Sequence, residues 1–211
     1  MDKADAFEGK PALFIETYGT HVELPKNYRL CQMVVEPSRY LLAEEIEKAM
    51  RSDEIYVSGN PVVSPATESI VLTFHPRLLR YNGRIMNPTK DSGECFEEID
   101  ITHGYFLEAG RFYLGSTQEV VGVGRKHVGI LHETGGRLLD SYSTHLNAAY
   151  HWPGSRHSIT LEIFSTEPRF VKAGYPATLL HIQELHPECG SPYNSRYNGQ
   201  DGPTVSRGNS T

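Results

Sequence analysis

The spacing of apolar side chains changes along the chain from a helical period to the period of β-strands. Within Ser38–Ser52 (SRYLLAEEIEKAMRS), apolar side chains recur at helical spacing and charged side chains occupy the opposite face. We therefore predict one amphipathic helix here, with Ser38 as its N-cap and Gly59-Asn60-Pro61 as the turn that closes the region. The apolar face of this helix consists of Leu41, Leu42, Ile46 and Ala49.

Beyond this helix the chain consists of short runs with a period of about two, as β-strands have. Glycine, proline, asparagine or aspartate separates almost every pair of runs, and a spacing of about 8–12 residues is typical of an all-β barrel or sandwich. We therefore predict a mainly β fold. The predicted strands are Glu68–Phe74, Glu98–Ile101, Tyr105–Leu107, Arg111–Leu114, Glu119–Val123, His127–Leu131, Ser158–Phe164, Arg169–Lys172 and Ala177–Leu185.

The last part of the chain, from Pro187, has few aliphatic residues and many Gly, Ser, Asn and Tyr residues. Such a segment adds little to a core, so we expect a flexible tail that is disordered or is ordered by a ligand or a neighbouring chain. A length of 211 residues fits one domain with a modest extension. The predicted organisation is an N-terminal extension over 1–37, a β domain over 38–186 and a C-terminal tail over 187–211.

Charge and cysteine usage exclude several classes of protein. The chain carries 26 acidic and 20 basic side chains, so we expect no direct binding of nucleic acid through charge. Cys31, Cys95 and Cys189 lack CxxC spacing, which argues against a disulfide framework and a structural zinc site. The first residues lack the apolar run of a secretory signal, and no run of about 18 apolar residues occurs in the sequence. We expect a soluble, cytoplasmic protein with no membrane partner.

The densest group of candidate catalytic residues is His151–Phe164 (HWPGSRHSITLEIF), a Pro-Gly turn followed by an alternating strand. Glu162 lies between Leu161 and Ile163 in this strand. A carboxylate flanked by apolar residues near a turn can serve as a general base. The alternative is a glutamate on a solvated strand face, which the pattern alone favours.

The ten histidines and two glycine-rich stretches are weaker signals. The histidine spacing matches neither HExxH nor the H-x-E and PCxxC signature of zinc nucleobase deaminases, so we interpret these residues as structural. Gly122–Gly129 and Glu133–Asp140 have the composition of loops that present N–H groups and an arginine to phosphate. As turns between strands, both stretches need no ligand.

The tail combines tyrosine, arginine and glutamine side chains, which suit stacking on a base and clamping of a phosphate. A disordered polar terminus is the alternative interpretation. The residues concerned are Tyr193, Arg196, Tyr197, Gln200, Ser206 and Arg207.

The order of these motifs resembles the dCTP deaminase branch of the dUTPase-like superfamily. After the helix come PATESIVLTF, GRFYLGSTQE, NAAYHWPGSRHSITLEIF and PYNSRYNGQDGPTVSR. The resemblance spans roughly residues 38–207, and its specific parts are Pro153–Glu162 and Tyr193–Arg207. It implies a divergent family member with a dUTPase-like β-barrel or β-clip fold, assembled as a homotrimer with active sites between subunits.

The resemblance also implies roles for single residues. Glu162 matches a general base that activates water for attack on C4 of cytosine without zinc. Asn147 and Ala148 match a Thr-Ala pair whose backbone groups read the pyrimidine edge. The nucleotide triphosphate would arrive with Mg²⁺, which neutralises its charge. The tail residues that match those closing over the nucleotide are Tyr193, Arg196 and Gln200, with Arg196 in the place of a lysine.

Two departures from the family pattern concern the same site. The family motif G-R-S-S-L-A-R-L-G, whose Arg and Ser residues hold phosphate and assist deamination, is replaced by Glu133–Asp140 (ETGGRLLD). The Asp that precedes the Pro-Gly pair is replaced by Trp152. Handling of the phosphate or the base must therefore differ from that of the typical enzyme. The candidate residues in the replaced motif are Thr134, Gly135 and Gly136, for substrate binding, and Arg137, for catalysis.

Three functions remain open at this point. The first is a deaminase acting on dCTP or a modified dCTP, which the retained Glu162 and the tail favour. The second is a dUTPase-type diphosphatase that uses Mg²⁺ and an activated water. The third is a non-catalytic trimer that binds a nucleotide or a protein, which the missing R-S-S motif favours.

Overall fold

The computed structural model describes residues 39–87, 90–134, 142–146 and 149–207, which belong to the compact unit Cys31–Thr211. These residues form a mainly β structure, as the sequence predicts. The helices are α1 (Ala43–Arg51) and the short 3-10 helix η1 (Gly93–Cys95). The strands are β1 (Ile55–Val57), β2 (Val62–Ser64), β3 (Ser69–Thr73), β4 (Arg77–Tyr81), β5 (Phe96–Asp100), β6 (Tyr105–Leu107), β7 (Arg111–Val123), β8 (His127–His132), β9 (Tyr142–Ser143), β10 (Tyr150–His151), β11 (Arg156–Ser165), β12 (Arg169–Val171) and β13 (Pro176–Glu184).

Helix α1 is shorter at its start than the sequence predicts. Leu42 is its N-cap residue, so the prediction of Ser38 as N-cap was wrong, and Ser38 itself lies outside the described residues. Leu42 is 56% exposed and does not belong to the buried face on which the pattern placed it. Ile46 and Ala49 are buried, as predicted.

The late start of α1 results from a competing backbone pairing. The Leu41 N–H donates to the Ile182 carbonyl at 2.8 Å, and the Glu184 N–H donates to the Arg39 carbonyl at 3.1 Å. The segment before the helix therefore runs extended along the end of β13. The Glu45 carboxylate then accepts the Leu42 N–H at 2.9 Å, which satisfies a donor at the helix start.

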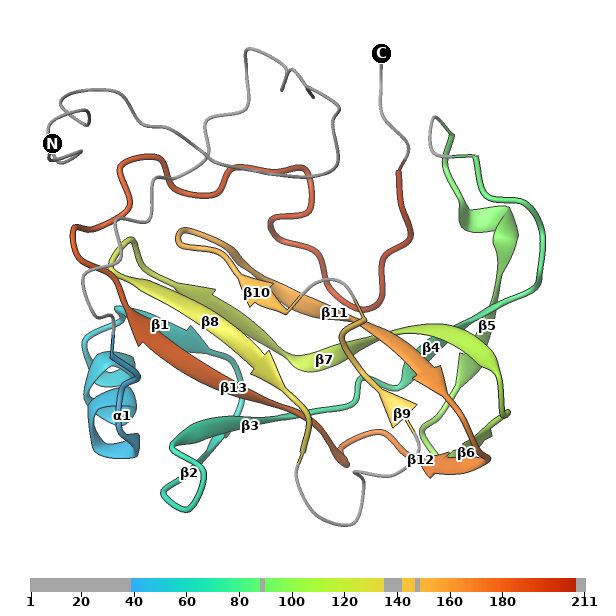
Figure 1. Ribbon diagram of the computed structural model, residues 1–211, viewed down its shortest axis with the longest axis horizontal. Helices are drawn as coiled ribbons and strands as arrows, with labels where there is room; N and C mark the ends of the chain where they lie inside the picture. Colours follow the sequence, from blue (N-terminus) through green and yellow to red (C-terminus); the bar gives the residue numbers. More distant parts are fainter. Residues whose placement is uncertain (1–38, 88–89, 135–141, 147–148, 208–211) are drawn as a thin grey trace, which may run out of the picture. The chain divides into compact units, whose positions relative to one another are not determined.

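The strands form two larger sheets and a small one, and all of their pairings are antiparallel (Figure 1). One larger sheet has the order β5-β4-β7-β11-β9, with β1 also on β7; the other has the order β10-β8-β13-β3-β2. Strands β12 and β6 form the small sheet. Within the described residues, the outer strands of each larger sheet do not pair with each other, so both sheets are open.

Strand β7 is continuous where the sequence predicts two strands, Arg111–Leu114 and Glu119–Val123. Gly115, between them, pairs with Leu161 of β11. A Cβ added at Gly115 would lie 2.9 Å from Cδ1 of Ile163. This glycine therefore allows close packing across the sheet and is not a turn residue.

Two hydrophobic clusters form the core, and the paired strands β7 and β11 contribute to both. The first contains Ile46 of α1, Val121 of β7 and Ile159 of β11. The second contains Tyr113 of β7 and Leu161 of β11. The apolar face that the sequence predicts for this strand is thus buried, which fixes the register of its polar face.

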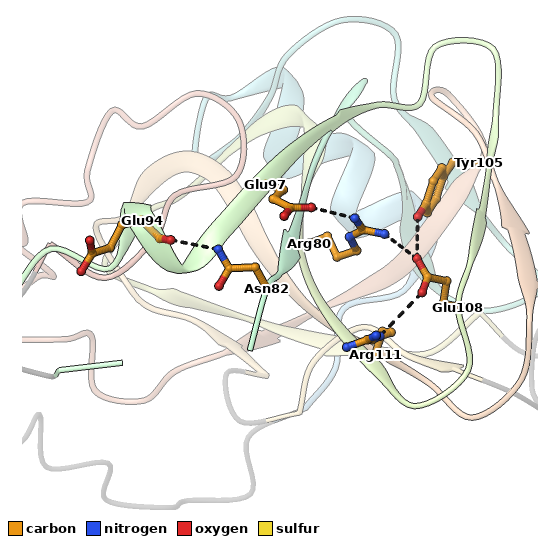
Figure 2. A network of polar contacts seen from close by, with 7 residues as sticks. All are labelled: Arg80, Asn82, Glu94, Glu97, Tyr105, Glu108 and Arg111. Carbon is orange, nitrogen blue, oxygen red and sulfur yellow. Dashed lines mark hydrogen bonds and ion pairs between the residues drawn. The ribbon is translucent and has the colours of Figure 1, made fainter. Parts of the chain in front are cut away.

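A polar network joins β4, β5 and β7 at the surface (Figure 2). The Arg80 guanidinium donates to Glu97 at 2.7 Å and to Glu108 at 2.6 Å. Glu108 also lies 3.6 Å from Arg111 and accepts a hydrogen bond from Tyr105 at 3.3 Å. Because these side chains are largely exposed and screened by solvent, the ion pairs contribute little to the free energy of unfolding.

Candidate active site

Strand β11 alternates between the core and a polar face that carries Thr160 and Glu162. Both side chains are half-buried, whereas Leu161 and Ile163 on the other face are buried. Glu162 lies opposite Leu114 of β7 on one side and forms a backbone bridge to His145 on the other. The alternation that the sequence predicts for this strand is therefore confirmed over 159–164, whereas Ser158 is buried and a register shift separates it from Thr160.

The tail lies along the beginning of β11 of its own chain, and Figure 1 shows it in red. The Gln200 side-chain amide donates to the Ser158 carbonyl at 3.0 Å and to Thr160 Oγ1 at 2.9 Å. In return, the Ser158 N–H donates to the Gln200 carbonyl at 3.1 Å. The Gly202 N–H donates to Ser158 Oγ at 2.8 Å. Gln200 is thus fixed beside Thr160, two strand residues or about 7 Å from Glu162 along the same face.

A cavity of about 270 Å³ lies between β10, β11 and the tail. Its lining is rich in aromatic rings and contains no aspartate, glutamate, lysine or arginine from the described part of the chain. A cavity of this kind suits an uncharged planar group, and its size fits part of a nucleotide. The lining residues are Tyr150, His151, Trp152, His157, Ile159, Thr160, Tyr193, Tyr197, Gln200, Thr204, Val205 and Ser206.

Ring contacts order the aromatic wall of this cavity. Tyr150 and Trp152 stack with ring centres 5.5 Å apart and planes at 25°. His151 and His157 meet at 4.8 Å, and the His157 ring lies 6.2 Å from that of Tyr193 in the tail. Burial lowers the pKa of His151 to about 3 and also lowers the pKa of His157. Both imidazoles are therefore neutral at neutral pH, and the wall carries no charge.

A second polar cluster, which the sequence analysis missed, lies beside Glu162. The Glu133 carboxylate accepts hydrogen bonds from Ser143 Oγ at 2.8 Å and from the Thr144 N–H at 2.9 Å. It lies 3.5 Å from His145 Nδ1. Because His145 is bridged to Glu162, these residues and the proposed base occupy one edge of the sheet. No local pattern indicates this arrangement, since it depends on pairing between distant segments.

Only some of the predicted site residues lie together at the cavity. Tyr193 and Gln200 both line the cavity. Glu162 does not line it, although Thr160 on the same face does. Arg196 is exposed, with its guanidinium over the Tyr197 ring at 5.3 Å. Thr134 is half-buried and does not line the cavity. The other predicted positions lie outside the described residues: Gly135, Gly136, Arg137, Asn147 and Ala148.

The described residues contain neither a candidate metal site nor a candidate membrane-spanning helix. Within 39–87, 90–134, 142–146 and 149–207, no three His, Cys, Asp or Glu side chains are grouped so as to hold a metal ion. Over the same ranges, no helix has the length and apolar character needed to cross a membrane.

Comparisons with known proteins identify the family to which this chain belongs. A family model described as dCTP deaminase-like matches residues 40–178. The dUMP-forming dCTP deaminase of Salinispora tropica is 32% identical over 133 residues, covering 58% of this chain and 68% of that protein. The dUMP-forming dCTP deaminase of Beutenbergia cavernae is 30% identical over 158 residues, covering 69% of this chain and 81% of that protein.

A solved structure shows the same fold. The crystal structure of 2′-deoxycytidine 5′-triphosphate deaminase from Agrobacterium tumefaciens superposes with a TM-score of 0.55 at 18% identity. The match covers 69% of this chain and 46% of that chain. On these grounds, the chain belongs to the dCTP deaminase-like family. The resemblance inferred from its motifs is thereby confirmed.

Proposed function

We propose that this protein is a hydrolytic deaminase of dCTP or a modified dCTP, with Glu162 as its general base and without zinc. The observation that carries the proposal is the position of Glu162 on β11. Its neighbour on the same face, Thr160, lines the cavity and is held by Gln200 of the tail. Membership of the dCTP deaminase-like family, with dUMP-forming dCTP deaminases as relatives, supports the substrate class.

In the proposed reaction, the Glu162 carboxylate takes a proton from a water molecule. The water oxygen attacks C4 of the cytosine ring and forms a C4–O bond. The protonated carboxylate delivers this proton to N3 of the ring. It then transfers the proton of the new C4 hydroxyl to the amine, so that the C4–N4 bond breaks, ammonia leaves and the C4 carbonyl forms. The products are ammonia and the corresponding uracil nucleotide. A side chain that exchanges a proton in this way contributes about 10²–10⁴ to the rate.

The cavity and the tail supply binding in this proposal. The uncharged aromatic wall suits the nucleoside part of the substrate, with Tyr193 and Gln200 closing over it. Arg196, outside the cavity, is available to the phosphates, and Mg²⁺ accompanies the triphosphate as part of the substrate. By the family resemblance, Thr134, Gly135, Gly136, Arg137, Asn147 and Ala148 contact the base or the phosphates, and three chains share their sites.

A second candidate function combines deamination with cleavage between the α- and β-phosphates. The relatives from Salinispora tropica and Beutenbergia cavernae are named as dUMP-forming, which favours this extension over deamination alone. An activated water would attack the α-phosphorus and release pyrophosphate, so that dCTP yields dUMP, ammonia and pyrophosphate.

The test is to incubate the purified protein with Mg²⁺ and dCTP, 5-methyl-dCTP or dUTP, and to measure ammonia and pyrophosphate separately. Ammonia alone indicates deamination, both products indicate the combined reaction, and pyrophosphate alone from dUTP indicates a diphosphatase. If the protein binds a nucleotide but releases neither product, the deaminase proposal fails and a non-catalytic nucleotide-binding function takes its place.

The role of Glu162 is tested by Glu162→Gln, which keeps the size of the side chain but cannot exchange the proton. We expect kcat to fall by about 10²–10⁴ with little change in nucleotide affinity. Glu167→Gln, at an exposed glutamate beyond the end of β11, is the matched control and should retain activity. Near-full turnover of Glu162→Gln would remove this residue from the mechanism.

A further inference from the structure

The sheet face that carries Glu162 is apolar beside this residue. Glu162 lies opposite Leu114 of β7, and Leu114 lies opposite Leu79 of β4. Residues that lie directly opposite each other share a face of the sheet, so these three side chains form one row. Leu114 and Leu79 are 9% and 8% exposed. The nearest neighbours of the proposed base across the strands are therefore two leucines.

The next row on the same face consists of aromatic side chains. Phe164, two residues beyond Glu162 on β11, lies opposite Phe112 of β7. On the neighbouring strands β4 and β5, Tyr81 lies opposite Phe96. The Phe96 ring lies 6.5 Å from that of Phe112 and 5.8 Å from that of Tyr81. Four rings from four strands thus form an aromatic row, whose members next to Glu162 are Phe164 and Phe112.

The polar groups that adjoin this aromatic row form hydrogen bonds within the chain. Ser143 of β9 lies opposite Phe164, and its hydroxyl donates to Glu133 at 2.8 Å. The Tyr81 hydroxyl donates to the Arg84 carbonyl. Phe164 itself is 36% exposed. The row therefore offers ring atoms to a ligand and suits an uncharged, apolar group.

The proposed reaction determines where the pyrimidine ring lies. C4 must come within one water molecule of the Glu162 carboxylate. Thr160, which lines the cavity, and Phe164, on the other side of Glu162, are each two strand residues or about 7 Å away along the same face. The sugar is attached at N1, across the ring from C4. A nucleotide whose sugar occupies the cavity therefore directs C4 and the neighbouring C5 toward the aromatic row.

We infer that Phe164 and Phe112 form an apolar subsite for a substituent at C5 of the pyrimidine, which makes the protein selective for 5-methyl-dCTP over dCTP. This inference rests on the proposed function, because the position of the ring follows from Glu162 as the base. A methyl group that lies against two phenyl rings is removed from water, which favours binding. One such group in an apolar pocket gives a discrimination of about 10–200-fold, and an open sheet face favours the low end.

The experiment compares kcat/KM for ammonia release from 5-methyl-dCTP and from dCTP. The wild type should prefer the methylated nucleotide by about tenfold. Phe164→Ala should remove most of this preference, because it removes one of the two rings, and should change kcat/KM for dCTP much less. Phe164→Leu should keep most of the preference, since leucine retains an apolar surface at this position.

A control variant and a binding measurement make the comparison specific. Phe170→Ala is the matched control, because Phe170 is 39% exposed, close to the value for Phe164, but lies on β12 of the small sheet. It should keep the preference of the wild type. Titration calorimetry of both nucleotides with Glu162→Gln, alone and combined with Phe164→Ala, measures the preference as a ratio of affinities without turnover. A thermal unfolding curve for each variant excludes loss of folding as the cause.

The outcomes separate this subsite from the proposed function. Equal kcat/KM for the two nucleotides, or a preference that Phe164→Ala leaves unchanged, would overturn the subsite while the deaminase stands. Dissociation of Phe164→Ala into single chains, seen by light scattering, would assign the aromatic row to contact between copies of the chain and overturn it as a subsite. If no nucleotide yields ammonia but Glu162→Gln binds 5-methyl-dCTP more tightly through Phe164, the subsite stands and the proposed deaminase fails.

Discussion

At the scale of single residues, His151 is a buried histidine whose surroundings disfavour the protonated, charged form of its ring. The residue is 2% exposed, and its Nε2 lies 3.0 Å from the Val121 carbonyl, so Nε2 carries the proton. Burial, and secondarily the neighbouring His157, lowers its pKa to about 3. A charge on this ring would be desolvated and would lie against another imidazole.

The burial of His151 predicts that acid lowers the stability of the folded protein. Between pH 6.5 and 3, the unfolded state binds a proton at His151 that the folded state does not bind. The free energy of unfolding therefore falls as the pH decreases from 6.5 toward 3, by up to about 1.4 kcal/mol per pH unit from this residue. Denaturant unfolding of the wild type and His151→Gln from pH 7 to pH 5 measures the effect.

The variant should show a shallower decrease than the wild type, because glutamine keeps a donor for the Val121 carbonyl and does not titrate. His103→Gln, at an exposed histidine, is the control and should follow the wild type. Other histidines with lowered pKa values, such as His75 and His127, act equally in all three proteins. Parallel curves for the wild type and His151→Gln would contradict the assignment.

Sequence alone predicts those site residues whose position depends on a local pattern. The alternation around Glu162 fixes its face on β11. The contact of Gln200 with this strand is a finding of the structure, since the tail motif indicates only a residue that closes over a nucleotide. The same reasoning cannot place Glu133 and His145 beside Glu162, because that contact depends on the pairing of distant segments. It also does not show that Arg196 lies outside the cavity, which depends on how the tail turns.

At the scale of elements, the Pro153-Gly154 turn positions the tail. The Tyr193 N–H donates to the Pro153 carbonyl at 2.7 Å. Gly154 has a φ of +84°, and a Cβ added to it would lie 2.5 Å from Cβ of Pro192. This glycine is required both by its backbone conformation and by the close approach of the tail.

Gly154→Ala should therefore displace the tail, and Gly174→Ala is its matched control. Gly174 has a similar φ of +78° but no atom within 4 Å of an added Cβ. Both variants bear backbone strain of about 1–2 kcal/mol. Only Gly154→Ala adds a steric clash, so its free energy of unfolding should be lower by a further 1–3 kcal/mol or so.

The measurements are denaturant unfolding and the protease sensitivity of the tail. Gly154→Ala should be cut in the tail faster than Gly174→Ala. Identical stability and identical cleavage of the two variants would show that the turn does not hold the tail.

The sequence predicts several of the longer strands and also the three-residue strands β6 and β12, but it divides β7 in two and misses four other short strands. Strands β3, β8, β11 and β13 alternate or are continuously apolar, so they are recognised to within a few residues. Strands β1, β2, β9 and β10 have two or three residues, too few to show a period. Strand β4 contains two adjacent leucines, Leu78 and Leu79, and so breaks the alternation. The start of α1 is decided by pairing with β13, which no local pattern indicates.

At the scale of the whole molecule, we predict that the chain assembles as a trimer. The cavity of one chain offers no acidic or basic side chain among the described residues, yet a charged nucleotide needs such groups. From the family resemblance, we expect these groups to come from a neighbouring subunit at a shared site. Light scattering at micromolar concentration should give three times the chain mass of 23.7 kDa. A mass of one chain would contradict the shared site.

The pair β7 and β11 has a consequence for how the domain unfolds. Each strand runs through both hydrophobic clusters, with Val121 and Tyr113 on β7 and with Ile159 and Leu161 on β11. Neither cluster can separate from these strands without exposing the other, so the two halves share one cooperative transition. A nucleotide bound against β11 would therefore raise the melting temperature of the whole domain and would not protect the tail alone.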